Sequence, residues 1–302
     1  MKYGIIPEKK IAVLELASAA GLELIPLKMR NPLITTTRGV GEMIIDALNK
    51  GFKRIILGIG DSATIDCGIG ALSILGVKFL DCDGKEIEKN CQGLLKLAEV
   101  DDSELCEEIK DIKLLVGADV SNILTGRDGA VVYARQKGAD RKTIPVIKKA
   151  LRNFQRVVLK RYGVDLDTIP GSGAAGGIGG ALKAILGAKL VPGFELIRKY
   201  IKIEKQIKEN ELVITGEGRV DQQTFAGKAI GQVLNIAQRF NRPVVLVAGS
   251  FVSGMKELSG PAVKEMYSIK RAGERIPSPD VTARRLVRFG YELGLRIRKG
   301  LL

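Results

Sequence analysis

Short apolar runs alternate along this chain with segments whose apolar residues recur at helical spacing. We expect strands over residues 10–17, 54–58, 77–80, 111–120, 212–215, 244–248 and 265–269. We expect helices over residues 40–49, 69–75 and 141–161, from about 228 to 237, and at the basic end of the chain. Strands that alternate with helices are typical of an α/β fold with a largely parallel sheet.

Polar segments that contain glycine follow two of the expected strands directly. Residues 216–228 follow the strand at 212–215, and residues 58–68 continue the strand at 54–58. Ligands of parallel α/β sheets bind beyond the carboxyl ends of the strands, where glycine lets the backbone approach them closely. In the segment 216–228, charges of both signs beside the glycines favour a magnesium–phosphate ligand. The alternative interpretation is an ordinary turn with surface ion pairs or a helix cap.

Two further polar segments carry weaker signals. Asp119 and Asn122 follow the strand at 111–120 and are either ligands or the side chains of Asx turns. The segment 171–176 fits GxGxxG, but residues 164–169 are too polar for the strand that a dinucleotide site requires before it. The phosphate-loop pattern GxxxxGK[ST] does not occur in the sequence.

The absence of histidine limits the chemistry more than any other feature of the composition. It excludes a Ser-His-Asp or Cys-His mechanism, so proton transfer has to use Asp, Glu, Lys or water. The four cysteines have no CxxC spacing, and zinc is therefore not expected. Because there is no apolar run of about 18 residues and no signal-peptide pattern, we expect a cytoplasmic protein without a membrane partner.

The net charge of +14 raises nucleic-acid binding as an alternative function. The densest basic run lies at residues 141–161, where apolar residues also recur at helical spacing. No nucleic-acid motif and no aromatic platform accompanies this run, so we favour the solvated face of a helix. Nucleic acid is therefore not an expected partner.

Several ordered motifs together resemble the bacterial-type (type 1) glycerate kinase family. They are Arg-Asn-Pro-Leu at 30–33 with Thr-Thr-Thr at 35–37, the loop at 58–66, Asp-Val-Ser-Asn at 119–122, Gln-Lys-Gly-Ala at 136–139, Pro-Gly-Ser-Gly-Ala-Ala-Gly-Gly at 170–177, and the segment at 216–228. The resemblance runs from about Tyr3 to the end of the chain.

The resemblance implies a fold of two α/β lobes within one glycerate-kinase-like unit, residues 1–302. One lobe, residues 38–75 plus 205–302, would hold a largely parallel, doubly wound, flavodoxin-like sheet that lacks its first strand. The other, residues 1–37 plus 76–204, would be a mixed α/β lobe. The resemblance also implies a transferase that phosphorylates the organic acid D-glycerate with ATP and Mg²⁺, and 2-phosphoglycerate is favoured over 3-phosphoglycerate as the product.

The same resemblance implies roles for individual residues. The expected catalytic residues are Asp66, Asp221, Arg219 and Lys228. An aspartate would orient magnesium or accept the hydroxyl proton, and the two cations would hold phosphate or the glycerate carboxylate. Asp66 and Glu217 are the expected magnesium ligands. The expected substrate- and nucleotide-binding residues are Gly60, Asp61, Ser62, Thr64, Asp119, Asn122, Gly216, Glu217, Gly218 and Gln223.

The chain departs from the family pattern in its first loop and at its front. Asp61, Ile65 and Cys67 stand where the family has glycine, asparagine and glycine, and a carboxylate at position 61 repels phosphate unless it binds magnesium. The family's Asp-Ser-Phe-Lys-Gly and Asp-Gly-Gly-Glu-Gly segments do not occur. We therefore expect an N-terminally incomplete unit with an exposed apolar sheet edge and little activity on its own. The alternative function is a truncated, non-catalytic binding or regulatory remnant.

Overall fold

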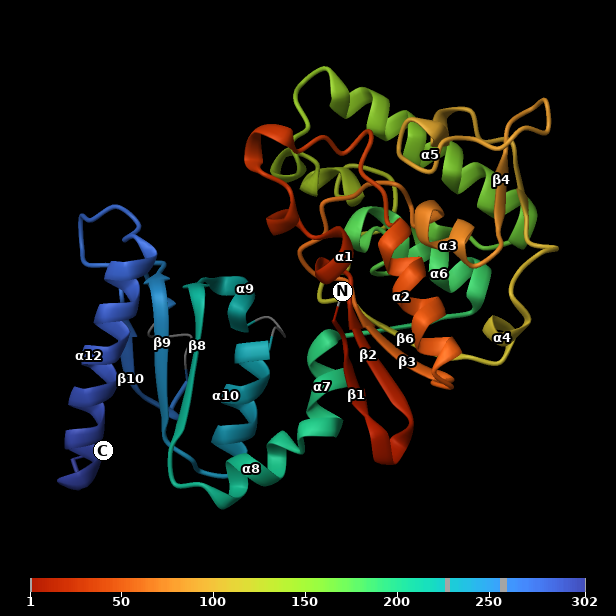
Figure 1. The fold of residues 1–302 in the computed structure, drawn as a ribbon. Helices are drawn as coiled ribbons and strands as arrows, with labels where there is room; N and C mark the ends of the chain where they lie inside the picture. The colour runs from red at the N-terminus through yellow and green to blue at the C-terminus, as the bar shows by residue number, and fades with distance from the viewer. Residues whose placement is uncertain (1, 226–228, 256–259, 302) are drawn as a thin grey trace. The chain divides into compact units, whose positions relative to one another are not determined.

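The computed structural model describes residues 2–225, 229–255 and 260–301. The chain forms two compact units, Met1–Leu196 and Ile197–Leu302. Both units combine helices with a sheet (Figure 1), which confirms the predicted α/β class. Within the described residues, no helix is both long enough and apolar enough to cross a membrane.

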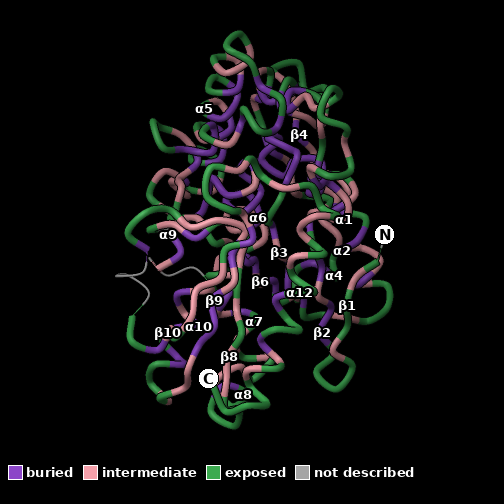
Figure 2. The backbone as a smooth tube through the Cα atoms, turned by 90° about the vertical axis from the view of Figure 1, so that its left-hand side faces the viewer, coloured by how far each residue is buried: buried purple, intermediate pink, exposed green. Residues whose placement is uncertain are grey.

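The first unit is built on a five-stranded sheet in the order β1-β2-β3-β6-β7. Its strands are β1 (Gly4–Ile6), β2 (Ile11–Glu15), β3 (Arg54–Gly58), β6 (Lys113–Gly117) and β7 (Lys189–Val191). β1 is antiparallel to β2, and the other four strands run parallel to one another. The central strands β3 and β6 are mostly buried, as Figure 2 shows in purple, which explains why the sequence has continuous apolar runs there.

The first unit has one large apolar core, and its helices follow here in chain order. They are α1 (Ala17–Ala20), α2 (Arg38–Asn49), α3 (Ile69–Ile74), α4 (Glu107–Lys110), α5 (Thr143–Tyr162), α6 (Ile178–Leu186) and α7 (Gly193–Ile201), the last of which continues beyond this unit. α2 can lie directly on α3 because Gly41 has no side chain: a Cβ there would stand 2.4 Å from the carbonyl oxygen of Ala71. A separate antiparallel pair, β4 (Lys78–Leu80) and β5 (Glu99–Asp101), flanks α3 and α5.

The second unit is a parallel three-stranded sheet with helices on both faces. Its elements are α8 (Ile203–Glu209), β8 (Val213–Val220), α9 (Gln222–Phe225), α10 (Ala229–Arg239), β9 (Val244–Phe251), β10 (Val263–Ser268) and α12 (Pro279–Arg298). Alternate residues of β9 serve opposite faces. Leu246 and Ala248 pack with Ile230 of α10, whereas Val245 and Val247 pack with Phe289 and Leu293 of α12.

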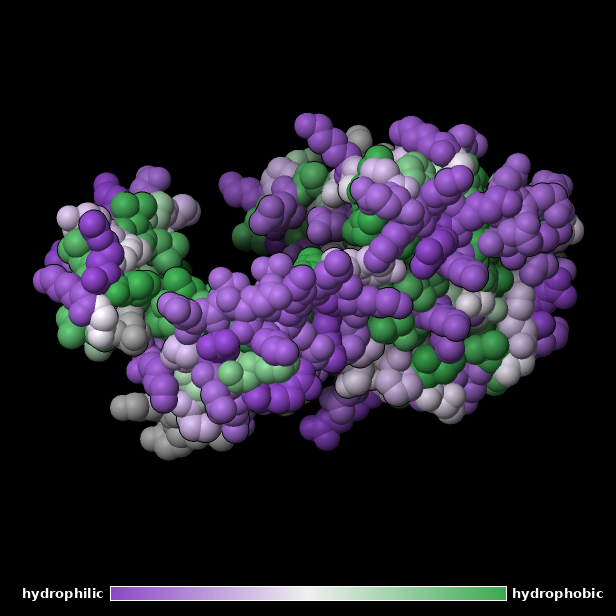
Figure 3. Space-filling model, turned by 90° about the horizontal axis from the view of Figure 1, so that it is seen from below, coloured by the Kyte–Doolittle hydropathy of each residue, from purple (hydrophilic) through white to green (hydrophobic). Residues whose placement is uncertain are grey.

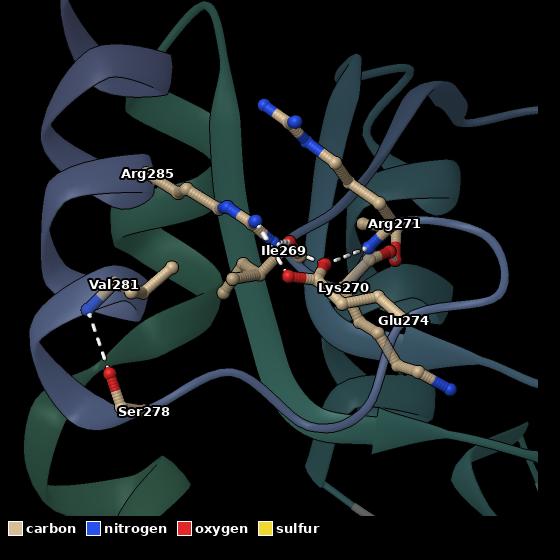
Figure 4. A network of polar contacts seen from close by, with 8 residues as sticks. Ile269, Lys270, Arg271, Glu274, Ser278, Val281 and Arg285 are labelled. Atoms are coloured by element: carbon tan, nitrogen blue, oxygen red, sulfur yellow. Dashed lines mark hydrogen bonds and ion pairs between the residues drawn. The ribbon is translucent and has the colours of Figure 1, made fainter.

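An ion pair fastens α12 to the segment that follows β10 (Figure 4). Both terminal nitrogens of Arg285 donate to the carboxylate of Glu274, at 2.7 and 2.8 Å, and Arg285 also donates to the carbonyl oxygen of Ile269. Ser278 caps the start of the helix by accepting from the backbone nitrogen of Val281. On the outer face of α12, Val287 is 73% exposed and Tyr291 is 70% exposed. Figure 3 shows apolar surface (green) at the left, where α12 lies in Figure 1.

Three differences from the sequence-based expectations have physical causes. The strands β1, β5 and β7 were not expected, because each has only three residues and shows no period, whereas the equally short β4 lies in the mostly apolar run at 77–80. The expected loop at residue 216 is wrong, because β8 continues to Val220 in register with β9. Residues 38–75, assigned above to the same lobe as residues 205–302, lie within the first unit, where β3 pairs with β2 and β6 at the centre of the sheet.

Candidate active site

A cavity of about 230 Å³ lies at the carboxyl edge of the five-stranded sheet. Four segments line it: residues 59–62 after β3, residues 117–120 at the end of β6, the two short 3₁₀ helices at 130–137, and the 3₁₀ helix at 174–177. Three of the four contain polar segments that were singled out in the sequence. The expectation that ligand chemistry collects beyond parallel strands therefore leads to this cavity, and Gly60, Asp61, Ser62 and Asp119 all line it.

Lys137 is the cation of this cavity, and the sequence analysis did not assign it a role. Its side chain is only 2% exposed. The ammonium donates to the hydroxyl of Ser62 at 2.6 Å and to the carbonyl oxygen of Thr64 at 2.8 Å. Burial lowers the pKa of Lys137 to about 7, although the nearby Asp66 carboxylate acts to raise it. Near neutral pH this side chain can therefore gain or lose a proton in response to a ligand.

Asp66 is completely buried below the cavity loop. Its two oxygens accept four hydrogen bonds, from the backbone nitrogen and the hydroxyl of Thr37, both at 2.7 Å, and from the backbone nitrogens of Gly68 and Gly70. Burial raises the pKa of Asp66, and these donors oppose that shift. Asp66 thus joins the starts of α2 and α3 to the loop after β3, and its oxygens are already occupied by protein donors.

Polar contacts fix the other two loops at the cavity. The carboxylate of Asp119 accepts from the backbone nitrogen of Gly193 at 2.7 Å, which connects the ends of β6 and β7. Asn122 donates to the carbonyl oxygen of Asp128 and accepts from the hydroxyl of Tyr133 at 2.8 Å. Asn122 therefore positions Tyr133, which lines the cavity. Thr64 is buried, and its hydroxyl has no hydrogen-bond partner among the described residues.

Left-handed backbone is concentrated around the same loops. Asp61 and Cys67 have φ values of 53° and 50°, and Ala175 and Gly176 have values of 52° and 73°. Asp61 and Cys67 are two of the positions where the family pattern has glycine. Glycine adopts this conformation without a steric cost, which explains why the family pattern has glycine at positions 61 and 67. Gly176 could not be replaced easily, since a Cβ would stand 2.1 Å from the carbonyl oxygen of Thr64.

The remaining predicted residues lie in the second unit. Gly216, Glu217, Gly218 and Arg219 all lie within β8. Gly216 allows close pairing, because a Cβ there would stand 2.1 Å from the carbonyl oxygen of Val247. Glu217 is half-buried, and its Oε1 has no hydrogen-bond partner in the part of the chain that the structure describes.

The end of β8 leads into the short helix α9. The backbone nitrogen of Asp221 donates to the hydroxyl of Thr224 at 3.1 Å, which starts this helix. Arg219 is exposed, and Gln223 lies within α9. Lys228 lies outside the described residues. β8 therefore carries the predicted charged residues to the carboxyl edge of the three-stranded sheet.

A larger cavity of about 700 Å³ lies at the opposite, amino edge of β9 and β10. Most of the charged side chains that line it already form an ion pair or hydrogen bonds with other groups of the protein. Arg296 pairs with Glu265 at 2.8 Å, Arg242 donates to the carbonyl oxygen of Lys208, and Lys264 donates to that of Pro261. Because neither its place in the sheet nor its residues match the predicted site, we assign the candidate site to the smaller cavity.

The carboxylates of the predicted site differ in how well they could serve as ligands of a divalent cation. Magnesium prefers oxygen ligands and commonly uses one or two carboxylates together with substrate phosphates. Asp66 is a poor fit, because protein donors use both of its oxygens. Asp61 and Asp119 line the cavity, and Glu217 keeps an oxygen without a partner among the described residues, so these three fit better. No group of three or more possible metal ligands occurs in the described ranges, so such an ion would need the substrate's oxygens as well.

Comparisons with known proteins relate this chain to one family. A sequence model of the glycerate kinase family matches residues 1–287. A glycerate kinase of Halalkalibacterium halodurans is 43% identical over 269 residues, which cover 89% of this chain and 71% of the relative. A glycerate 2-kinase of Escherichia coli is 40% identical over 268 residues, covering 88% and 70%. The crystal structure of a glycerate kinase 2 from Salmonella typhimurium LT2 superposes with a TM-score of 0.78 at 36% identity, covering 99% of this chain and 79% of that one.

Proposed function

We propose, from the premise that this chain belongs to the glycerate kinase family, that it transfers the terminal phosphoryl group of ATP to the 2-hydroxyl of D-glycerate. The observation that carries this proposal is the cavity with Lys137 and Ser62 at its wall. Its volume of about 230 Å³ is below the range of about 300–1,000 Å³ that drug-sized ligands occupy. A three-carbon acid suits it better than a nucleotide does.

The proposed division of labour follows from the two sets of residues. The cavity of the first unit holds the acid, and its hydroxyl donors and cation fix the orientation of that substrate. The residues at the end of β8 hold the phosphates of ATP, with Arg219 and Lys228 as the cations. Phosphoryl transfer depends on positioning and on neutralising charge more than on covalent chemistry. Magnesium would supply part of that neutralisation, held by Glu217 or by Asp61 and Asp119 with phosphate oxygens.

The proton of the attacking hydroxyl needs an acceptor, and the chain has no histidine to provide one. Asp221 is the proposed acceptor, as the family resemblance implies, and Asp66 is committed to Thr37 and to the start of α3. The relative from Escherichia coli is named a glycerate 2-kinase, which supports the proposal that the 2-hydroxyl is phosphorylated. Asp66 is proposed to act indirectly, by holding the loop that carries Ser62 and Thr64.

The experiment is ADP release from ATP, magnesium and D-glycerate, with the phosphorylated carbon identified by ¹³C–³¹P coupling in NMR. We expect phosphate on carbon 2, and we expect Asp221→Asn to lower turnover about 10²- to 10⁴-fold, the range for losing a general base. Asp83→Asn, in an exposed turn, is the control and should keep full turnover. Phosphate on carbon 3 would overturn the position. Binding of D-glycerate without any ADP release would favour the non-catalytic alternative.

A further inference from the structure

A buried lysine without a carboxylate partner is an unusual feature of this cavity. An ammonium group has three protons to donate, and Lys137 uses two of them, on Ser62 and Thr64. Both acceptors are neutral. In the described part of the chain no carboxylate forms an ion pair with Lys137. Burying a charged group is costly unless it is paired, so the structure leaves both a proton and a charge available for an anion.

We propose that Lys137 recognises the carboxylate of the acid substrate and is the residue that makes this site specific for an organic acid. This inference rests on the proposed function and deepens it. The side chain lies at the wall of the cavity, and Ser62, which also lines it, fixes the ammonium by accepting one of its protons. The ligand chemistry is therefore a single carboxylate on a small molecule.

The other charged groups around the cavity make a second anion-binding point less favourable. Asp61 and Asp119 line the cavity, and Asp66 lies beneath the loop. Tyr133, on the neighbouring 3₁₀ helix, has a raised pKa because of its burial and is neutral near pH 7. Arg30 donates to the carbonyl oxygen of Gln136, beside Lys137, but does not line the cavity. Lys137 is thus the one cation among the described residues that line this cavity.

Carboxylate binding should also bring a proton with it. Because the pKa of Lys137 is about 7, the side chain is mostly neutral at pH 8 before the ligand binds. A carboxylate next to the ammonium raises that pKa again. The complex would then take up most of a proton per bound acid at pH 8.

The test is calorimetric titration of the full chain with D-glycerate and with D-glyceramide, its neutral amide. Wild type is compared with Lys137→Met, which removes the charge and keeps the length of the side chain. Lys160→Met is the matched control, because Lys160 is exposed on α5. We expect Lys137→Met to weaken D-glycerate binding about 10- to 100-fold, the range for a hydrogen bond to a charged group. Its effect on D-glyceramide should be small, and the control should bind both ligands as wild type does.

A second measurement needs only the wild type and therefore does not depend on how the variant folds. Titration at pH 8 in two buffers of different ionisation enthalpy gives the number of protons taken up. We expect close to one proton with D-glycerate and none with D-glyceramide. The proposal would be overturned if no proton were taken up, or if Lys137→Met weakened the binding of D-glycerate and of D-glyceramide equally.

The same titrations separate this inference from the proposed function. If D-glycerate binds with both signatures but the chain releases no ADP, the carboxylate site stands and the kinase proposal fails. If ADP is released and Lys137→Met binds D-glycerate as tightly as wild type, the kinase proposal stands and the role of Lys137 is refuted. If wild type binds no D-glycerate at all, both fail.

Discussion

Asp61 has a backbone conformation that favours glycine. Its φ is 53°, and its carbonyl oxygen accepts from the backbone nitrogen of Leu22, which holds the turn in place. A non-glycine residue in the left-handed region costs about 1–2 kcal/mol, and aspartate tolerates it better than most. The loop therefore stores a small strain at the mouth of the candidate site, where such strain is often found.

Replacing this residue by glycine should release the strain. We expect Asp61→Gly to raise the free energy of unfolding by roughly 0.5–1 kcal/mol, because the relief exceeds the extra entropy of glycine in the unfolded chain. Urea denaturation measures it. Asp83→Gly is the control: Asp83 is exposed, but its φ is not in the left-handed region, so the same substitution should destabilise by a similar amount. An equal loss in both variants would contradict the strain argument.

At the level of residues, four of the thirteen residues that line the candidate cavity were also expected from the sequence. Gly60, Asp61, Ser62 and Asp119 could be predicted because a glycine- or acid-containing segment directly follows an apolar run. Lys137 could not, because one lysine in a chain of 48 lysines and arginines carries no sign that it is buried. The sequence signal that includes it is the Gln-Lys-Gly-Ala motif at 136–139, to which no role was assigned.

At the scale of elements, long segments were predictable and their ends were not. The apolar stripe of α5 and the buried runs of β3 and β9 set the main helices and strands. The sequence at Gly216 and Gly218 predicts a turn, although the same lack of a side chain also permits close pairing of two strands. A Cβ on Gly249 would stand 2.3 Å from the carbonyl oxygen of Gly218. The choice between these uses of glycine depends on the neighbouring strand, which one segment of sequence does not reveal.

The contact between α12 and the segment after β10 gives a pH-dependent prediction for the second unit. Arg285 lowers the pKa of Glu274 to about 2. A carboxyl whose pKa falls on folding stabilises the fold above its unfolded pKa of about 4.5, and that contribution is lost as the pH falls towards 2. We therefore expect Glu274→Gln to lower the melting temperature at pH 7, and the difference from wild type to shrink between pH 5 and pH 3.

Thermal denaturation followed by circular dichroism across this pH range measures the effect. Glu292→Gln is the matched control, because Glu292 makes a single exposed contact with Arg288 on α12 itself. Its effect at pH 7 should be smaller than that of Glu274→Gln. A difference between wild type and Glu274→Gln that stays constant down to pH 3 would show that the ion pair does not stabilise this unit.

At the scale of the whole molecule, basic side chains lie on the solvent face of a helix whose opposite face contributes to the core. The long basic helix α5 buries Ile147, Leu151 and Phe154 in the core of the first unit and exposes its lysines and arginines. This is the solvated face that the sequence analysis favoured over nucleic-acid binding. The core of that unit consists entirely of residues between positions 3 and 190, and every strand of the five-stranded sheet lies in the same range.

The first unit should therefore fold and bind its ligand without the second. We expect a fragment of residues 1–202, which keeps α7 whole, to unfold cooperatively and to bind D-glycerate within a few-fold of the full chain. The reason is that all residues lining the candidate cavity lie between positions 59 and 175. The fragment should release no ADP from ATP, because it lacks β8 and its charged residues. A folded fragment that does not bind D-glycerate, while the full chain does, would show that the acid site needs residues beyond position 202.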